Sequence, residues 1–184
     1  MLQDVAMYIL DITNNSIRAE AKNIQIVFET KNSTNECKLV ITDDGYGMSE
    51  EQLEQVCDPF FTTRETRKVG LGISFLHQLA TQCKGELLID SKEGMGTTVA
   101  LKYQRNHFDA PPLGNIAESI VVLLQADENI EYQFTYVNDE GVFHLDTKEI
   151  KSVLEDVNIS EPSILLWLKE YIEEGLLKIG REKI

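Results

Sequence analysis

The sequence has few of the residues that build disulfide frameworks or membrane spans. It contains three cysteines among 184 residues, and Cys37, Cys57 and Cys83 lack the spacing of metal ligands. An odd number of cysteines argues against a disulfide framework and favours a reducing compartment. No early apolar run is long enough to span a membrane, and no signal-peptide pattern opens the chain. These features predict a cytoplasmic protein without a membrane segment.

Basic residues are also scarce. The chain has 17 Lys and Arg against 31 Asp and Glu, which gives a formal net charge of −14. Binding a phosphate backbone requires clustered cations, so the composition argues against a nucleic-acid partner. An acidic chain can still bind a nucleotide through one local cationic pocket or a magnesium ion. The length allows one domain with a small appendage.

Hydrophobic periodicity predicts the elements of the first 105 residues. Apolar positions repeat with helical spacing in residues 2–21, and Ser49 is a suitable N-cap for a short helix. A third helix begins at the glycines near residue 70 and ends at Gly85. Two hairpins and a loop complete the region, with strands expected at 23–29, 37–43, 86–92 and 97–103 and the loop at 58–69. This order predicts an α+β sandwich with helices on one face of the sheet.

A stretch rich in proline and glycine, residues 106–114, predicts a linker between residues 1–105 and a small α+β appendage, residues 115–184. In the appendage we expect a helix at 115–125, a hairpin at 131–146, a helix near 147–156, and a helix at 161–174 that Ser160 caps and Gly175 ends.

The last helix carries an apolar stripe that has two interpretations. The stripe is the core of the appendage, or it is a docking face for a partner. Its members are Ile164, Leu165, Leu168, Tyr171 and Ile172, with Trp167 at the edge.

Polar residues that could take part in binding or catalysis first occur on the opening helix. Asp11 and Asn15 are four residues apart and therefore share one helix face. An amide oxygen suits a hard cation such as Mg²⁺, and a neighbouring carboxylate could take a proton from water. A solvated helix face explains the same pair, so the pair alone decides nothing.

Three glycine-containing segments follow. In "VITDDGYGMS", Asp43 ends a strand and could accept a hydrogen bond from an exocyclic amine, while Gly45 and Gly47 allow the backbone close to a flat ring. In "KVGLGIS", glycines precede a helix whose free N–H groups favour phosphate. In "EGMGTTVAL", a turn places Thr97 at a strand start. Each segment taken alone also fits an ordinary turn.

Together and in this order, over about residues 5–103, these segments resemble the superfamily of gyrase, heat-shock chaperone, histidine kinase and mismatch-repair ATPases (GHKL). "GLGISFLHQLATQCKGELLIDSKEGMGTTVAL" is similar to the second half of a histidine-kinase catalytic domain. The resemblance implies a two-layer α/β sandwich with a mixed sheet, and ATP and Mg²⁺ as ligands.

The resemblance also implies roles for individual residues. Asp43 would accept from the adenine amine, with Thr97 beside it; Asn15 would bind the magnesium ion; and residues 58–69 would form a lid over ATP. The remaining nucleotide-binding positions that we expect are Gly45, Gly47, Met48, Phe61, Thr62, Arg67, Lys68, Gly70, Leu71 and Gly72.

Two residues bear on the reaction. Hydrolytic relatives carry Glu four residues before the magnesium-binding Asn, and the shorter Asp11 here predicts slow hydrolysis. Arg18 matches a cation that phosphate-transferring relatives place three residues after that Asn, although a solvated Arg explains it equally.

Ten residues precede Asp11, and none of the three histidines has the context of a phosphoacceptor, so we expect the acceptor on another protein. The expected function is a magnesium-dependent ATP-binding regulatory protein that acts as a kinase in trans. A slow ATP-hydrolysing switch and a non-catalytic ATP sensor remain alternatives, and a homodimer stays open.

Overall fold

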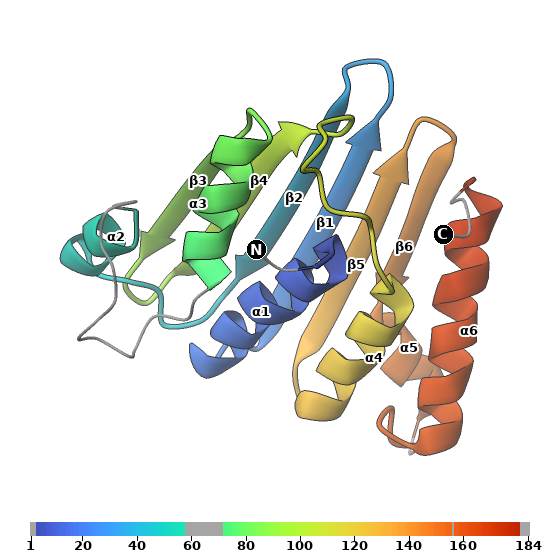
Figure 1. Ribbon diagram of the computed structural model, residues 1–184. Coiled ribbons are helices and arrows are strands. Elements are labelled where there is room, and N and C mark those ends of the chain that lie inside the picture. Colours follow the sequence, from blue (N-terminus) through green and yellow to red (C-terminus); the bar gives the residue numbers. More distant parts are fainter. Residues whose placement is uncertain (1–2, 58–71, 156, 181–184) are drawn as a thin grey trace.

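The computed structural model describes residues 3–57, 72–155 and 157–180. It consists of one mixed β-sheet with helices packed on it (Figure 1). The elements in chain order are α1 (Val5–Arg18), β1 (Asn23–Lys31), β2 (Glu36–Asp43), α2 (Glu50–Cys57), α3 (Gly72–Gln82), β3 (Glu86–Lys92), β4 (Gly96–Gln104), α4 (Ile116–Ala126), β5 (Glu131–Asn138), β6 (Gly141–Asp146), α5 (Thr147–Leu154) and α6 (Pro162–Lys178).

The sheet has six strands in the order β3-β4-β2-β1-β5-β6. All neighbours pair antiparallel except β1 and β5, which are parallel. The three expected hairpins are present, and the α+β class with a mixed sheet is confirmed. The pairing of β1 with β5 was not expected from the sequence. It joins the chain before residue 106 to the chain after it in a single sheet.

Burial alternates along the strands, because successive side chains of a strand point to opposite faces. One face is covered by α3, α1, α4 and α6, which lie side by side in that order (Figure 1). The core forms between this helical layer and the sheet. Its largest fully buried side chains include Tyr8, Ile9, Ile24, Ile26, Phe28, Leu76, Leu101, Tyr132 and Phe134.

The predicted linker packs against the first helix. The N–H groups of Val5 and Ala6 donate to the carbonyl oxygens of Pro112 and Leu113, at 2.9 and 3.1 Å. The linker thus satisfies backbone donors that a helix start leaves free. A division of the chain into domains at residues 106–114 stays a prediction about independent folding.

Two expectations for the last helix were wrong. The helix runs through Gly175 to Lys178, and a Cβ at Gly175 would collide with the Phe143 ring. This glycine therefore allows α6 to pack closely on β6 and does not end the helix. The Ser160 hydroxyl donates to Glu128 and Asn158, and the N-cap is Glu161, followed by Pro162. By contrast, the expected cap Ser49 accepts from the N–H of Gln52.

The apolar stripe of α6 divides between the two interpretations. Leu165, Leu168 and Ile172 are buried together with Leu176, so this part of the stripe belongs to the core. Tyr171 and Trp167 remain 44% and 47% exposed.

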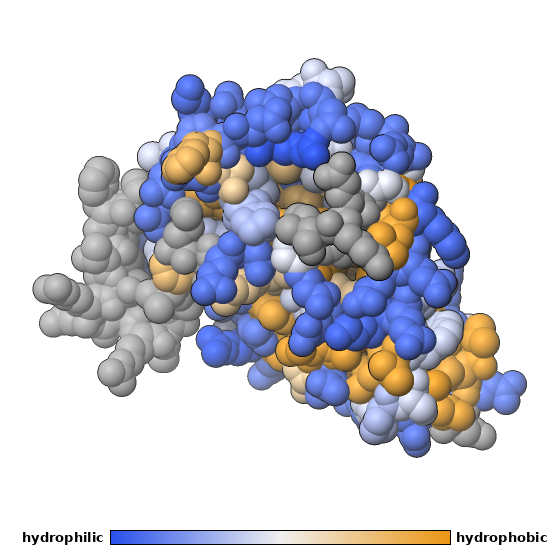
Figure 2. Space-filling view, turned by 45° about the vertical axis from the view of Figure 1, so that its right-hand side comes forward, coloured by the Kyte–Doolittle hydropathy of each residue, from blue (hydrophilic) through white to orange (hydrophobic). Residues whose placement is uncertain are grey.

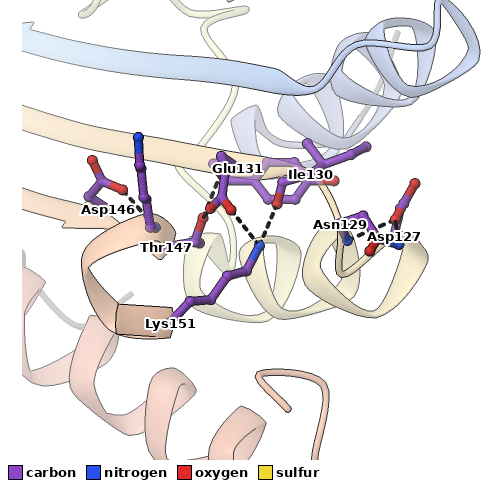
Figure 3. Close-up of polar contacts among 9 residues, drawn as sticks. Asp127, Asn129, Ile130, Glu131, Asp146, Thr147 and Lys151 are labelled. Carbon is purple, nitrogen blue, oxygen red and sulfur yellow. Dashed lines mark hydrogen bonds and ion pairs between the residues drawn. The ribbon is translucent and has the colours of Figure 1, made fainter. Parts of the chain in front are cut away.

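A polar network fastens α5 to β5 (Figure 3). The Thr147 hydroxyl donates to Glu131 Oε2 at 2.8 Å and accepts from the Tyr132 N–H at 2.8 Å. Lys151 Nζ contacts Glu131 Oε1 at 3.0 Å and the Ile130 carbonyl at 3.1 Å. Each polar group in this network has a hydrogen-bond partner, which offsets the free-energy cost of burying it.

Within the described residues, no helix combines the length and apolar character that crossing a bilayer requires.

Candidate functional site

The site is built around Asp43, the last residue of β2. Its side chain is only 9% exposed, although it is a carboxylate. Oδ2 accepts from the Ser16 hydroxyl at 2.6 Å, and Oδ1 accepts from the N–H groups of Gly45 and Thr97 at 3.0 and 3.2 Å. Hydrogen bonds of this kind compensate a carboxylate for the loss of water. They also fix its orientation at the edge of the sheet.

Ser16 was not expected from the sequence. It lies on the buried face of α1, four residues after buried Ile12, and its partner Asp43 is 27 positions further along the chain. The helical spacing was a usable signal, because a hydroxyl on a buried face needs a hydrogen-bond partner.

The two glycines of the loop lie close to neighbouring backbone. A Cβ at Gly45 would lie 2.6 Å from the Ala19 carbonyl oxygen at the end of α1. Gly47 has φ +66°, and a Cβ there would collide with the carbonyl of Lys92. Glycine is therefore required at both positions by close approach, and at Gly47 also by the left-handed conformation. Contact of these glycines with a bound ring stays a prediction.

The second acid of the loop has a different task. Asp44 accepts from the N–H groups of Lys22 and Asn23 at 2.7 and 2.8 Å, and from the Asn23 side chain at 2.7 Å. Burial raises the pKa of the Asp44 carboxyl, but these hydrogen bonds outweigh burial and hold the pKa below its usual value. Asp44 therefore ties the loop to the start of β1.

Thr97 lies directly opposite Asp43 in the β2–β4 pairing, as the sequence predicts for neighbours in this site. Its hydroxyl is 2.8 Å from Ser91 Oγ, which also accepts from the N–H of Met48 at 2.9 Å. Ser91 was not expected, and it connects the loop after β2 to the β3–β4 hairpin. Met48 is half-buried and packs against the core.

The other predicted residues on α1 lie along its carboxyl-terminal half. Asp11 is next to Gly72, the first residue of α3, where a Cβ would collide with Asp11 Oδ2. This buried oxygen has no hydrogen-bond partner among the described residues. Asn15 is half-buried, and Arg18 is exposed.

Within the described chain, no three His, Cys, Asp or Glu side chains are arranged to hold a metal ion. Mg²⁺ commonly takes one or two protein oxygens and completes its coordination with water and phosphate. The Asn15 amide and the unpartnered Asp11 oxygen, one helical turn apart, fit that mode.

Six of the predicted site residues lie outside the described residues: Phe61, Thr62, Arg67, Lys68, Gly70 and Leu71. The predicted lid at 58–69 also lies outside them.

Two hollows lie at opposite ends of the central strands. Asp43 and Asp44 border one of about 280 Å³, which Glu131, Asp146 and Lys148 also line. The larger, about 490 Å³, lies beside Arg105 and is away from Asp43.

A family model described as "Histidine kinase-, DNA gyrase B-, and HSP90-like ATPase" matches residues 3–107, more than half of the chain. The chain belongs to this ATPase family. The match includes α1, the loop after Asp43 and the start of α3, so the described site residues all lie within the family domain.

Relatives of this ATPase-family domain include sensor kinases. Sporulation kinase E of Bacillus subtilis is 37% identical over 59 residues, covering 32% of this chain and 8% of the kinase. The sensor histidine kinase ZraS of Escherichia coli K12 is 31% identical over 93 residues, covering 50% of this chain and 20% of the kinase. The chain thus matches only a small part of these curated relatives.

The likeness of this ATPase-family chain to a solved structure covers more of the chain than the family model matches. The N-terminal domain of a DNA repair protein aligns with 86% of this chain, and the chain covers 59% of it, with a TM-score of 0.53 and 14% identity. At this identity the likeness concerns the fold alone.

Proposed function

We propose that this histidine-kinase-like domain binds ATP with the adenine amine on Asp43. The observation that supports the proposal is a nearly buried carboxylate that three donors orient. An ionised carboxylate only accepts hydrogen bonds, so it favours an amine over a carbonyl on the purine. Gly72 at the start of α3 would turn backbone N–H groups toward the phosphates.

Magnesium dependence is part of the same proposal. Asn15 would provide an amide oxygen to Mg²⁺, and the ion would neutralise phosphate charge. Asn15 and Asp11 are on the same face of α1, so the metal and Asp11 would lie near the same phosphates.

We further propose that the chain transfers phosphate to a partner protein in trans. Two relatives are named as kinases, which favours transfer over hydrolysis. Two of the histidines bond within this chain: His107 accepts from the Asp109 N–H at 3.2 Å, and His144 bonds to Thr135 at 2.9 Å. His77 Nε2 is buried and has no hydrogen-bond partner among the described residues, so burial alone keeps this atom from solvent. Arg18 would offset charge on the transferred group.

Slow ATP hydrolysis is the second candidate, and the state of Asp11 favours it. The Asp11 oxygen has no hydrogen-bond partner among the described residues, so it would be available to take a proton from an attacking water bound beside it. In this function nucleotide turnover would switch the conformation of the protein, with no phosphate acceptor.

Calorimetric titration with ATP tests the binding proposal. Asp43→Asn keeps the shape of the side chain but presents an N–H₂ group to the adenine amine. We expect ATP affinity to fall at least about 100-fold, because donors then face each other. The melting temperature is the control for folding. ATP affinity that persists in Asp43→Asn would place the purine elsewhere.

Incubation with γ-labelled ATP distinguishes the two reactions. Label on an added partner protein supports transfer, whereas label that appears only as free phosphate removes it. Asp11→Asn should then abolish the release of phosphate and leave ATP binding intact. Unchanged release would exclude Asp11 as the base.

A further inference from the structure

The outer face of α6 exposes large apolar side chains in a row. Leu166, Trp167, Tyr171 and Leu177 are 59%, 47%, 44% and 42% exposed, while the opposite face of the helix is buried. Figure 2 turns this side of the molecule forward, and hydrophobic residues lie among hydrophilic ones in its lower part. Single exposed apolar residues are common, but a group on one helix marks an interaction surface.

The two aromatic side chains pack against each other, and one of them packs against a buried ring. The Trp167 and Tyr171 rings stack with centroids 5.4 Å apart. Tyr171 contacts the Phe143 ring at 5.9 Å, and Phe143 contacts the fully buried Phe134 at 6.3 Å. This row of rings connects the surface to the core. Aromatic side chains of this kind are typical centres of protein interfaces.

Acidic side chains alternate with the aromatic ones. Glu170 follows Trp167 by three residues, and Glu174 follows Tyr171 by three, so each pair shares one helix face. Both glutamates are exposed, and no described cation forms an ion pair with them. Aromatic faces beside carboxylates attract the guanidinium group of arginine, which stacks on rings and donates to carboxylates at the same time.

We propose that this outer face, defined by Leu166, Trp167, Glu170, Tyr171 and Glu174, docks a basic amphipathic segment of a partner protein. An arginine of that segment would stack on the aromatic pair and pair with the glutamates. A second copy of this chain is disfavoured as the occupant, because two molecules with a net charge of −14 repel each other. The face lies outside the family match at 3–107, so the proposal does not depend on ATP binding.

The test uses the full chain and a fluorescently labelled synthetic helical peptide with arginines on one side and leucines on the other. Two matched peptides carry lysine or glutamate in place of arginine. We expect saturable binding by anisotropy for the arginine peptide, weaker binding for the lysine peptide and none for the glutamate peptide. Binding should weaken severalfold on raising the salt concentration from about 0.05 to 0.3 M.

Variants then locate the binding. Trp167→Ala and the double variant Glu170→Gln/Glu174→Gln should each weaken binding by about tenfold or more. Phe108→Ala is the matched control, because Phe108 is an aromatic side chain 98% exposed in the linker, and its removal should change nothing. Melting temperatures report folding. The double variant touches no core residue, so the test holds even if Trp167→Ala fails to fold.

Three results would overturn the proposal. One is no saturable binding of the arginine peptide. Another is binding that the double variant retains at full affinity. The third is sedimentation of the wild-type chain as a dimer that Trp167→Ala dissociates, since the face would then belong to a second copy.

Discussion

Asp43 holds its position through donors from three parts of the chain. The hydroxyl comes from α1, one N–H group from the loop after β2 and the other from β4. These three donors hold both carboxylate oxygens in place within the protein itself. Preorganisation of this kind lowers the entropic cost of binding.

Ser16→Ala tests how much this orientation contributes. The variant removes a hydrogen bond to a charged group, which typically contributes about 1.5–3 kcal/mol. We expect ATP affinity to fall by about tenfold or more, measured by calorimetry, with the fold preserved. Ser163→Ala, an exposed serine on α6, is the control. An unchanged affinity would mean that the two N–H donors orient Asp43 without help.

At the residue scale, the expected site residues were those of a recognisable motif, and the residues that hold them in place were not expected. Asp43 and Thr97 were expected together, and they face each other across two strands. Ser16 and Ser91 were not expected, because their partners lie far away in the sequence or in another hairpin. Small hydroxyls fit many environments, so their partners become visible only once the strands are paired.

Among the elements, α6 shows how one local signal can have two meanings. A glycine near the end of a helical pattern predicts a C-terminus, but Gly175 lies inside α6 against Phe143. A glycine near the end of a helical pattern can also be there because the helix packs closely on a neighbouring side chain. The hairpins were predictable because alternation and turn residues are local, whereas the parallel pairing of β1 with β5 joins residues more than 100 positions apart.

The variant Gly175→Ala distinguishes a glycine that serves close packing from one that ends a helix. If the glycine serves packing, the added methyl group overlaps the Phe143 ring, and unfolding free energy should fall by about 1–3 kcal/mol. Higher helix propensity of alanine would otherwise stabilise α6 by about 1 kcal/mol. Urea denaturation measures the sign of the change in unfolding free energy, and Glu174→Ala is the control at a neighbouring exposed position. A more stable Gly175→Ala variant would contradict the packing role.

The start of α5 makes a pH-dependent contribution. Asp146 accepts from the Lys148 N–H and from Gln133 Nε2, both at 2.8 Å. Burial raises the pKa of its carboxyl, but these hydrogen bonds outweigh it and bring the pKa below the usual 3.8. A lowered folded-state pKa adds stability above the unfolded-state value, and this stability is lost as pH falls through the folded-state value.

Asp146→Asn should therefore cost stability at neutral pH, and this cost should shrink progressively as the pH falls below the usual 3.8 toward the lower folded-state pKa. Asparagine is a comparable N-cap, so the remaining difference reports the charge. Urea denaturation of both proteins at about pH 7, 5 and 3 provides the measurement. A difference that stays constant over this range would show that the Asp146 charge adds nothing.

At the scale of the whole molecule, the chain after residue 107 completes the sheet and the helical layer of the family domain. β5 covers the edge of β1, and α4 packs beside α1, so both central elements of the family domain have neighbours from this later chain. An uncovered β1 would present free backbone groups and the apolar residues Ile24, Ile26 and Phe28 without their neighbours. Such an edge promotes association between chains.

A chain of residues 1–107, the extent of the family match, tests this dependence. We expect a lower melting temperature and concentration-dependent association in sedimentation, because the edge of β1 and one side of α1 become exposed. Adding residues 108–184 as a separate polypeptide should reverse both effects, since the parallel β1–β5 pairing needs no covalent link. If residues 1–107 unfold cooperatively as a monomer at the temperature of the full chain, the linker divides two independent domains. The sheet would then be continuous, but its two parts would unfold independently of each other.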